Sequence, residues 1–570
     1  MSLRGKLWNW TGFRNREDQI TILLSLIIGV IVGLTVVAFI LLTGRLASRM
    51  YPPESAVWRR LLVPIIGTLV SGFLLFKYFP NARGSGIPQA KFALFIQDGY
   101  ISLKTVIGKF VCCSISLASG IALGREGPSV QIGAGIASVL GRRYGLSKHT
   151  VKALVPVGCS AALAAAFNTP IAAVLFSLEE ILGDLHAPVL GSVVLSSATS
   201  WMVLHLILGD EPLFHVPAYQ LVNPMEFGFY AILGIVGGFA SVCFVKLLLK
   251  LRVWFRQLPA WTAWMQPGVG GLLMGVFALI RPEVLGVGYD YVDRVLTGDF
   301  PWKIVVLLAV MKLIATPTCY SSGNAGGIFG PSLFIGAMVG GSVGYAAHTL
   351  FPNLTANPGA YALVGMGTAF AGIVRTPLTS VIMIFEMTRD YSIIVPLMIS
   401  NLISFFISQQ LQHEPIYEAL ALQEGVYLPT GESRDQLEGV RVGEVMLMDV
   451  DPLPANADLD EAKARFEAEA CHAWPVGERS NLIGIVSSHQ IETAPNAPKT
   501  IRELLVNSKD YPFIHSDHPV SYALERMGSN GVDAIPVVSR ANIRQMFGVV
   551  RLTDILSKYG VAGIPGVYAK

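Results

Sequence analysis

Charged residues are scarce in this chain. Lys, Arg, Asp and Glu make up 14% of its 570 residues, whereas an ordinary soluble domain carries about 25%. Apolar residues reach 52%, and the mean hydropathy is +0.54. The segment 20–44 has no charged residue and is long enough to cross a bilayer core of about 30 Å. This composition excludes an ordinary soluble protein and predicts an integral membrane protein.

Other absences narrow the classes of function. The chain has only six cysteines, and five of them lie in apolar segments, so the sequence does not indicate a disulfide framework. It contains no HExxH motif, CxxC pair or carboxylate cluster that would indicate a metal site. A formal net charge of +3 is too small to indicate nucleic acid as a partner. We therefore expect neither metal nor nucleic acid.

The few charges are unevenly distributed. The first 410 residues hold 28 basic and 17 acidic residues, and the last 160 hold 14 and 22. This change divides the chain into an apolar body and a soluble tail. Basic residues before the first apolar span predict a cytoplasmic N-terminus. The domains expected from these patterns are a cytoplasmic segment at 1–19, a transmembrane domain at 20–421, a linker at 422–437 and a tail at 438–560.

The transmembrane domain repeats itself, with halves at about 20–210 and 225–421. Gly124-Arg-Glu-Gly-Pro-Ser129 recurs 203 residues later as Gly327-Ile-Phe-Gly-Pro-Ser332, and Glu179 matches Glu386 at an offset of 207. Duplicated halves with Gly/Pro-interrupted apolar segments are typical of transporters that bind substrate between the repeats. The alternative interpretation is that small residues such as Gly133 and Gly336 only allow close packing of helices.

Three Gly-rich breaks are candidate anion contacts, at 84–88, 124–128 and 327–331. Each break would present backbone amides at the start of a helix, where the partial positive charge attracts a small anion. Ser85 adds a hydroxyl donor. Glu126 lies in the second break, and a charge in a membrane segment costs several kcal/mol unless function retains it. We expect its carboxylate to compete with the anion.

At these motifs the chain resembles the CLC family of chloride channels and chloride/proton exchangers. The resemblance implies that Ser85, the amides of Ile328 and Phe329, and Tyr417 surround the central anion. It implies that Glu126 is the gating glutamate, with Arg125 and Gly127 beside it as further anion contacts. A homodimer embedded in the lipid bilayer, with both termini cytoplasmic, is also expected.

The choice between exchanger and channel depends on Glu180. Family exchangers carry a glutamate here that passes protons to and from the cytoplasm, and family channels carry an apolar residue. The repeat counterpart of Glu180 is Met387, whereas Glu179 recurs as Glu386. We therefore interpret Glu179 as structural and Glu180 as functional. The predicted function is exchange of chloride for protons, and the alternatives are a passive chloride channel and a membrane enzyme that uses Glu126 and Glu180 as acid and base.

The tail also contains a repeat, with units at 438–497 and 498–560. Pro475-Val476 and Pro536-Val537 stand 61 residues apart, and the pattern resembles a tandem CBS pair, an α/β module that often binds ATP or AMP. Ribose recognition in that family uses a Thr or Ser followed three residues later by an Asp. The first unit has Ser487 but Gln490, and the second has Asp554 but Arg551. A purely structural module is the alternative, and no cofactor is required for transport.

The fold class that follows is an all-α polytopic membrane protein with two inverted-topology repeats, together with a small α/β cytoplasmic CBS pair.

Overall fold

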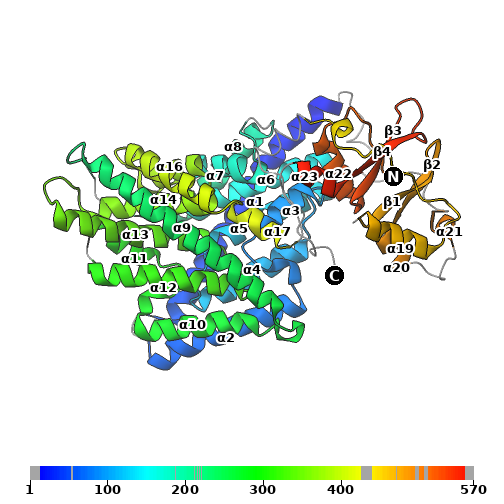
Figure 1. The fold of residues 1–570 in the computed structure, drawn as a ribbon. Coiled ribbons are helices and arrows are strands. Elements are labelled where there is room, and N and C mark those ends of the chain that lie inside the picture. Colours follow the sequence, from blue (N-terminus) through cyan, green and yellow to red (C-terminus); the bar gives the residue numbers. More distant parts are fainter. Residues whose placement is uncertain are drawn as a thin grey trace, which may run out of the picture. The chain divides into compact units, whose positions relative to one another are not determined.

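The computed structural model gives the chain as two compact units that divide after Leu428. Figure 1 shows a helical body and a smaller tail that contains both helices and strands. The fold class predicted from the sequence is confirmed. The expected linker at 422–437 lies largely outside the described residues, as do residues 1–12. The structure describes residues 13–52, 55–185, 188–210, 212–214, 216, 219, 221–298, 300–424, 440–469, 471–493, 500–505 and 511–558.

The body is built from helices alone within the described residues. Eight of the described helical segments are long and apolar enough to cross a membrane. The first half consists of α1 (Phe13–Met50), α2 (Val57–Lys77), α3 (Ile87–Phe95), α4 (Leu103–Ala118), α5 (Glu126–Arg143), α6 (Lys148–Phe167), α7 (Pro170–Phe176) with a π-helical turn (Ser177–Leu182), and α8 (Leu190–Leu208). The second half consists of α9 (Glu226–Gln257), α10 (Gln266–Ile280), α11 (Tyr289–Leu296), α12 (Trp302–Ser321), α13 (Phe329–Leu350), α14 (Pro358–Val374), α15 (Pro377–Thr388) and α16 (Ile394–Leu411), after which α17 (Ile416–Leu422) ends the body.

The two halves correspond helix for helix, α1–α8 to α9–α16. The match extends to local backbone geometry, because α6 ends at Asn168 with φ 60° and α14 ends at Arg375 with φ 66°. In each half a Thr-Pro pair follows, and the proline is the first residue of the next helix, where its fixed φ suits the helix start. The sequence repeat is therefore a structural repeat.

The repeats meet through equivalent residues. Gly124 N donates to Gly327 O at 2.7 Å, and Gly327 N donates back to Gly124 O at 2.7 Å. The bridge is antiparallel, so two equivalent segments run in opposite directions past each other. This reciprocity is what an inverted-topology pair requires.

Small residues set the helix spacing inside each half. A Cβ built on Gly133 would lie 2.2 Å from Gly158 O, and one built on Gly336 would lie 2.3 Å from Gly365 O. The helix pairs α5/α6 and α13/α14 thus touch backbone to backbone. For these two glycines, the close-packing interpretation holds.

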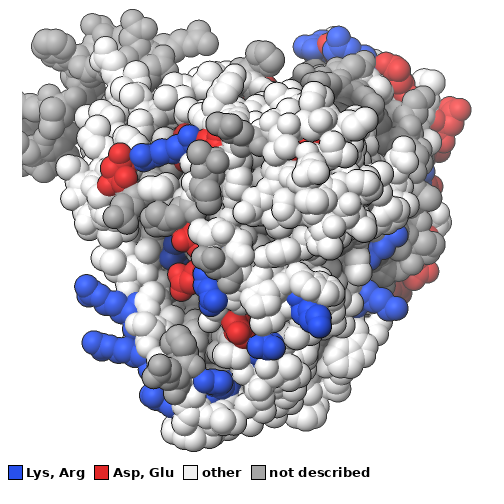
Figure 2. Space-filling view, turned by 90° about the vertical axis from the view of Figure 1, so that its left-hand side faces the viewer, with Lys and Arg blue, Asp and Glu red and all other residues white. Residues whose placement is uncertain are grey.

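The outside of the body is apolar. Large side chains that would be buried in a soluble protein are exposed along the helices, with Leu206 80%, Phe239 57% and Ile66 56% exposed. Figure 2 shows one face on which charged groups are scattered among wide uncharged areas. An apolar surface of this extent requires a lipid environment.

The tail contains two similar hairpins. Strand β1 pairs with β2 and β3 with β4, both antiparallel, and the register shifts at Val476/Gly477 in the first and at Val537/Val538 in the second. One apolar cluster contains Trp474 and Val476 of the first unit with Ala534 and Val549 of the second, so each unit buries a face on its twin. The tail elements are α19 (Leu459–Ala468), β1 (Ala473–Glu478), β2 (Asn481–Ser487), α20 (Ser488–Thr493), α21 (Ile501–Leu505), α22 (Val520–Asn530), β3 (Ala534–Val538), β4 (Met546–Arg551) and α23 (Leu552–Lys558).

Candidate functional site

The three Gly-rich breaks meet at one buried junction. Gly84 pairs with Ala325 as Gly124 pairs with Gly327, and Gly326 N donates to Gly84 O at 3.3 Å. The N-terminal ends of α3, α5 and α13 are thereby held together. Their free amides and helix dipoles supply partial positive charge without a mobile cation. This junction is suited to binding a small anion.

Gly86 shows why the junction needs glycine. Its φ of +105° is a backbone conformation that residues with a side chain rarely adopt, and an added Cβ would lie 2.5 Å from Gly127 O. The break at 84–88 and the start of α5 therefore touch through their backbones. Gly127 is needed at this contact because a side chain there would also clash, since its Cβ would lie 2.7 Å from Ser85 O.

Two buried lysines hold equivalent loops. Lys109 Nζ on α4 donates to Ala82 O at 3.1 Å and Gly84 O at 2.6 Å. Lys312, its counterpart on α12 at an offset of 203, donates to Val284 O at 2.9 Å and Gly286 O at 2.5 Å. Lys109 thus fixes the loop that carries Ser85.

Two hydroxyl groups lie buried at the predicted anion site. Ser85 and Tyr417 are both 0% exposed. Neither Ser85 Oγ nor Tyr417 Oη makes a well-formed hydrogen bond to a residue that the structure describes, although the Tyr320 hydroxyl interacts with Ser85. A buried hydroxyl without a partner costs about 1–3 kcal/mol. Tyr417 also packs against Phe329 at the start of α13, with ring centroids 6.2 Å apart. Both hydroxyls can donate to an anion.

Glu126 is the first residue of α5 and is completely buried. Its Oε1 accepts from Tyr289 Oη at 2.5 Å, and its Oε2 accepts from Gly330 N at 3.3 Å. The carboxylate thus takes an amide at the N-terminus of α13, the helix start to which Ile328 and Phe329 belong. Arg125 lies beside it, with Nε 3.9 Å from Glu126 Oε1.

Tyr289 is a site residue that the sequence reasoning missed. It opens α11, and Arg125 lies over its ring at 5.7 Å. The sequence repeat could have indicated this loop, because Gly286-Val-Gly288-Tyr289 matches Gly84-Ser-Gly86-Ile87 at an offset of 202. The first half therefore contributes the Ser85 hydroxyl. The second half contributes, two positions later in the equivalent loop, the Tyr289 phenol that holds Glu126.

Glu180 belongs to a buried three-charge cluster. Lys91 Nζ on α3 lies 2.8 Å from Glu180 Oε1 and 2.5 Å from Glu418 Oε1 on α17. All three residues are buried, at 3%, 6% and 5% exposure for Lys91, Glu180 and Glu418. The sequence reasoning missed Lys91 and Glu418, although Lys91 was visible as a charge within an apolar segment. These two residues come close to Glu180 only through packing of three distant segments.

Glu179 makes a different set of contacts. Its carboxylate accepts from Thr379 N at 2.8 Å at the start of α15, and Glu386 of the other half accepts from Ala172 N at 2.7 Å at the start of α7. These reciprocal bonds satisfy amides that a helix start leaves open. Glu179 is thus a structural partner, as expected from its repetition.

The repeats differ by one residue at Glu180. In each half the helix ends at a residue with left-handed backbone geometry, Gly183 in the first and Arg389 in the second. Glu179 lies four residues before Gly183, whereas Glu386 lies three residues before Arg389. The first half absorbs the additional residue in the π-helical turn Ser177–Leu182, and the second half continues as the regular helix α15. Single π turns of this kind are frequent at functional sites. Here the turn contains Glu180.

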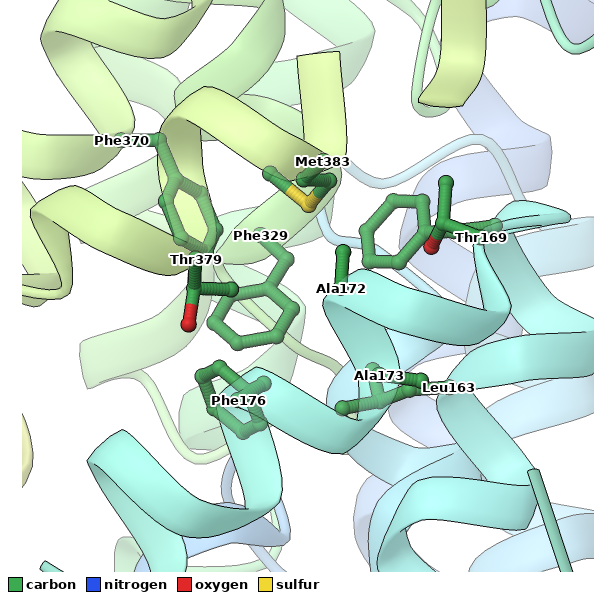
Figure 3. A pocket seen from close by; sticks show the side chains of 10 residues that line it. Leu163, Thr169, Ala172, Ala173, Phe176, Phe329, Phe370, Thr379 and Met383 are labelled. Atoms are coloured by element: carbon green, nitrogen blue, oxygen red, sulfur yellow. The ribbon is translucent and has the colours of Figure 1, made fainter. Parts of the chain in front are cut away.

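An apolar cavity lies between the halves beside Phe329. Figure 3 shows Phe329 between Phe176 and Ala173 on one side and Phe370 and Met383 on the other. The cavity walls carry no charged group, and Thr169 and Thr379 are the polar residues that line them.

The predicted nucleotide contacts of the tail lie in internal bonds. Asp554 accepts from Arg551 through both carboxylate oxygens, at 2.7 and 2.8 Å, and Arg551 also reaches Glu469 at 2.8 Å. The hydrogen bond that Arg551 donates to Asp554 raises the pKa of Arg551, so the guanidinium stays charged. Ser487 N donates to Gln490 Oε1 at 2.9 Å. In each unit, the residue that departs from the family pattern binds the residue that matches it. Gln490 binds Ser487 in the first unit, and Arg551 binds Asp554 in the second.

A helical membrane body has inverted repeats whose helix starts meet at one buried junction. These features define the class of membrane transport proteins. Residues 67–409 match the family model for voltage gated chloride channels, and residues 501–560 match the CBS domain model. The chain belongs to this chloride channel family, the CLC family, and carries a CBS domain.

The relatives of the chain include transporters of known structure. The chain is 30% identical over 436 residues to the H(+)/Cl(-) exchange transporter ClcA of Salmonella arizonae. The aligned region covers 73% of this chain and 91% of ClcA. A slow cyanobacterial Cl-/H+ antiporter superimposes with a TM-score of 0.65 at 27% identity, covering 71% of this chain and 97% of its own. A eukaryotic CLC transporter gives 0.67 at 21% identity over 94% and 97%, which shows the shared fold alone.

Proposed function

We propose that this protein exchanges chloride for protons across a membrane. The observation that carries the proposal is the pairing of one anion junction with two separate buried carboxylates, Glu126 and Glu180. A passive conduit needs no second acid, because a buried charge is expensive in a membrane segment. Relatives named H(+)/Cl(-) exchange transporters support the same function, whereas a further relative, 34% identical over 350 residues, is named a putative chloride channel protein.

In this proposal chloride binds at the junction between Ser85 Oγ, Tyr417 Oη and the amides of Ile328 and Phe329. Arg125 raises the positive potential nearby, and Gly127 lets the breaks approach. Glu126 in its ionised form takes the Gly330 amide and so competes with the anion, and protonation removes the charge that holds it there. Glu180 exchanges protons with the other side of the membrane.

The same resemblance leads us to propose a homodimer with both termini in the cytoplasm. The tail is proposed as a regulatory or structural module, with at most weak binding of ATP or AMP through Ser487 or Asp554.

Flux measurements in vesicles that contain only this protein test the exchange. With valinomycin and K⁺ to balance charge, chloride leaving the vesicles should drive protons inward and make the outside alkaline. Glu180→Gln should keep chloride flux and lose the pH change. Fast chloride flux without proton movement in the unmodified protein would instead establish the passive channel.

A further inference from the structure

Glu418 is the least explained charge in the body. It lies on α17, directly after Tyr417, and its Oε1 contacts Lys91 Nζ at 2.5 Å. Its Oε2 is buried and has no hydrogen-bond partner among the described residues. An ionised carboxylate normally fills both oxygens with donors when it is removed from water. An ionised Glu418 therefore leaves one buried oxygen without a donor.

The charges of the cluster do not balance. Lys91 contributes one positive charge, and Glu180 and Glu418 contribute two negative charges when both are ionised. Among the residues that the structure describes, no second cation forms an ion pair with the cluster. Glu179 is bound to the amides of α15, and Arg375, which is within electrostatic range of Glu418, donates to the carbonyls of Ser408 and His413.

An uncompensated buried charge costs several kcal/mol. Two carboxylates that share one cation avoid this cost by holding one proton between them, because like charges at close range cannot both ionise easily. With that proton, the cluster of Lys91, Glu180 and Glu418 is neutral. Without it, the cluster carries one negative charge.

The cluster is connected to the anion junction by two short helices. Lys91 lies six residues after Ser85, on the helix α3 that the Ser85 loop starts, and Glu418 is adjacent to Tyr417 on α17. The contact between Lys91 and Glu418 joins α3 to α17. Both partners of Glu180 are therefore carried by elements that also carry a proposed chloride ligand.

We propose that Glu418 is a second proton-carrying carboxylate of the exchanger, which shares one exchangeable proton with Glu180 across Lys91. The proton leaves the carboxylic acid of Glu418 for the carboxylate of Glu180, and Lys91 then stabilises the Glu418 carboxylate. A chloride ion beside Tyr417 favours the protonated cluster, because it adds negative charge nearby. The proposal rests on the exchange function proposed above.

Paired flux and infrared measurements on the full-length protein test this role. In vesicles, Glu418→Gln should lower the proton flux per chloride by at least about tenfold, since a positioned proton-transfer group contributes roughly 10²- to 10⁴-fold. Glu418→Asp, which keeps the acid, should restore part of the ratio. The matched control Glu414→Gln removes the same charge four residues earlier and should keep the unmodified ratio.

Infrared difference spectra between high and low pH read the shared proton without transport. The unmodified protein should show a carboxylic acid C=O band that shifts in D₂O, and Glu418→Gln should change that band while Glu414→Gln leaves it unchanged. A band and a flux ratio that Glu418→Gln leaves as in the unmodified protein would overturn the proposal and leave Glu418 a structural counter-ion.

The two readouts separate the two proposals. An unmodified protein that moves chloride without protons would refute the exchange function, whereas the infrared band still decides whether Glu418 holds the proton. If Glu418→Gln fails to fold, the Glu418→Asp variant carries the test. An unchanged band in that variant counts against the shared proton, and a shifted band counts for it.

Discussion

Glu126 is held in place by contacts that depend on its charge. The Gly330 amide and the Tyr289 hydroxyl both donate to its carboxylate, and a neutral amide side chain accepts such bonds less strongly. In Glu126→Gln we expect chloride flux to continue, proton coupling to disappear and most of the pH dependence to be lost. Parallel chloride and pH recordings in vesicles measure all three.

A buried carboxylate elsewhere in the body controls for the loss of charge. Glu226 is 0% exposed and accepts from Ala356 N at 2.8 Å, so Glu226→Gln should keep its proton coupling. Proton pumping by Glu126→Gln at the unmodified ratio would show that the gating assignment is wrong.

We expect Ser85 to contribute to the preference of the protein among anions. Its hydroxyl is buried and makes no well-formed hydrogen bond to a described residue, and such a donor is worth about 1–3 kcal/mol to whichever ligand it binds. Ser85→Pro removes this donor and should raise nitrate transport relative to chloride by about tenfold, which corresponds to about 1.4 kcal/mol. Competition between the two anions in the flux assay gives the ratio.

Ser196→Ala provides the comparison for Ser85→Pro. Its hydroxyl donates to Val157 O within the packed helices and not at the junction, so this variant should leave the preference unchanged. An unaltered preference in Ser85→Pro would mean that selectivity resides in other groups.

At the level of elements, the junction depends on breaks that only glycine can form. In Gly86→Ala the new methyl would meet Gly127 O at 2.5 Å while φ stays at +105°. Left-handed strain and overpacking together should destabilise the fold by at least about 2 kcal/mol. A lower melting temperature of the purified protein in detergent measures this loss.

Two other glycines separate strain from crowding. Gly145 has φ +70° with open space around it, and Gly191 has open space and helical geometry. Gly145→Ala should show the strain alone, and Gly191→Ala should be neutral or slightly stabilising. Equal melting temperatures for Gly86→Ala and Gly191→Ala would refute the steric account.

The sequence predicted much at this scale and missed specific contacts for a physical reason. The breaks, the helix start at Glu126 and the difference between Glu179 and Glu180 were legible, because they are local patterns or repeats. Lys91, Glu418 and Tyr289 were missed by the sequence analysis, because their partners are distant in the chain. Lys91 lies 89 residues from Glu180 and 327 residues from Glu418, and Tyr289 lies 163 residues from Glu126. Packing of the halves brings them together, and local sequence patterns do not encode it.

For the whole molecule, the question is whether the tail responds to nucleotides. Asp554 is bound by Arg551 through both oxygens, so a ribose would have to displace an ion pair. We expect ATP and AMP to bind weakly at most, in titration calorimetry of the full-length protein. Arg551→Thr, which releases Asp554 and restores the family pattern, should tighten binding.

An exposed arginine controls for the change in charge. Arg502 lies on α21, and Arg502→Thr should not tighten nucleotide binding. Tight binding by the unmodified tail would contradict the expectation, and a site unaffected by Asp554→Ala would exclude that residue as the ribose contact. Nucleotide can alter transport only if it favours one state of the protein over another.

The reciprocal bonds between the halves make each half dependent on the other. Gly124 and Gly327 satisfy each other, and Glu179 and Glu386 each complete the first turn of a helix in the opposite half. One half by itself would leave these groups without partners, so it would need a second copy in the opposite orientation within the same membrane. Because both halves belong to one chain, equivalent positions need not be identical, and the additional residue beside Glu180 is one place where they differ.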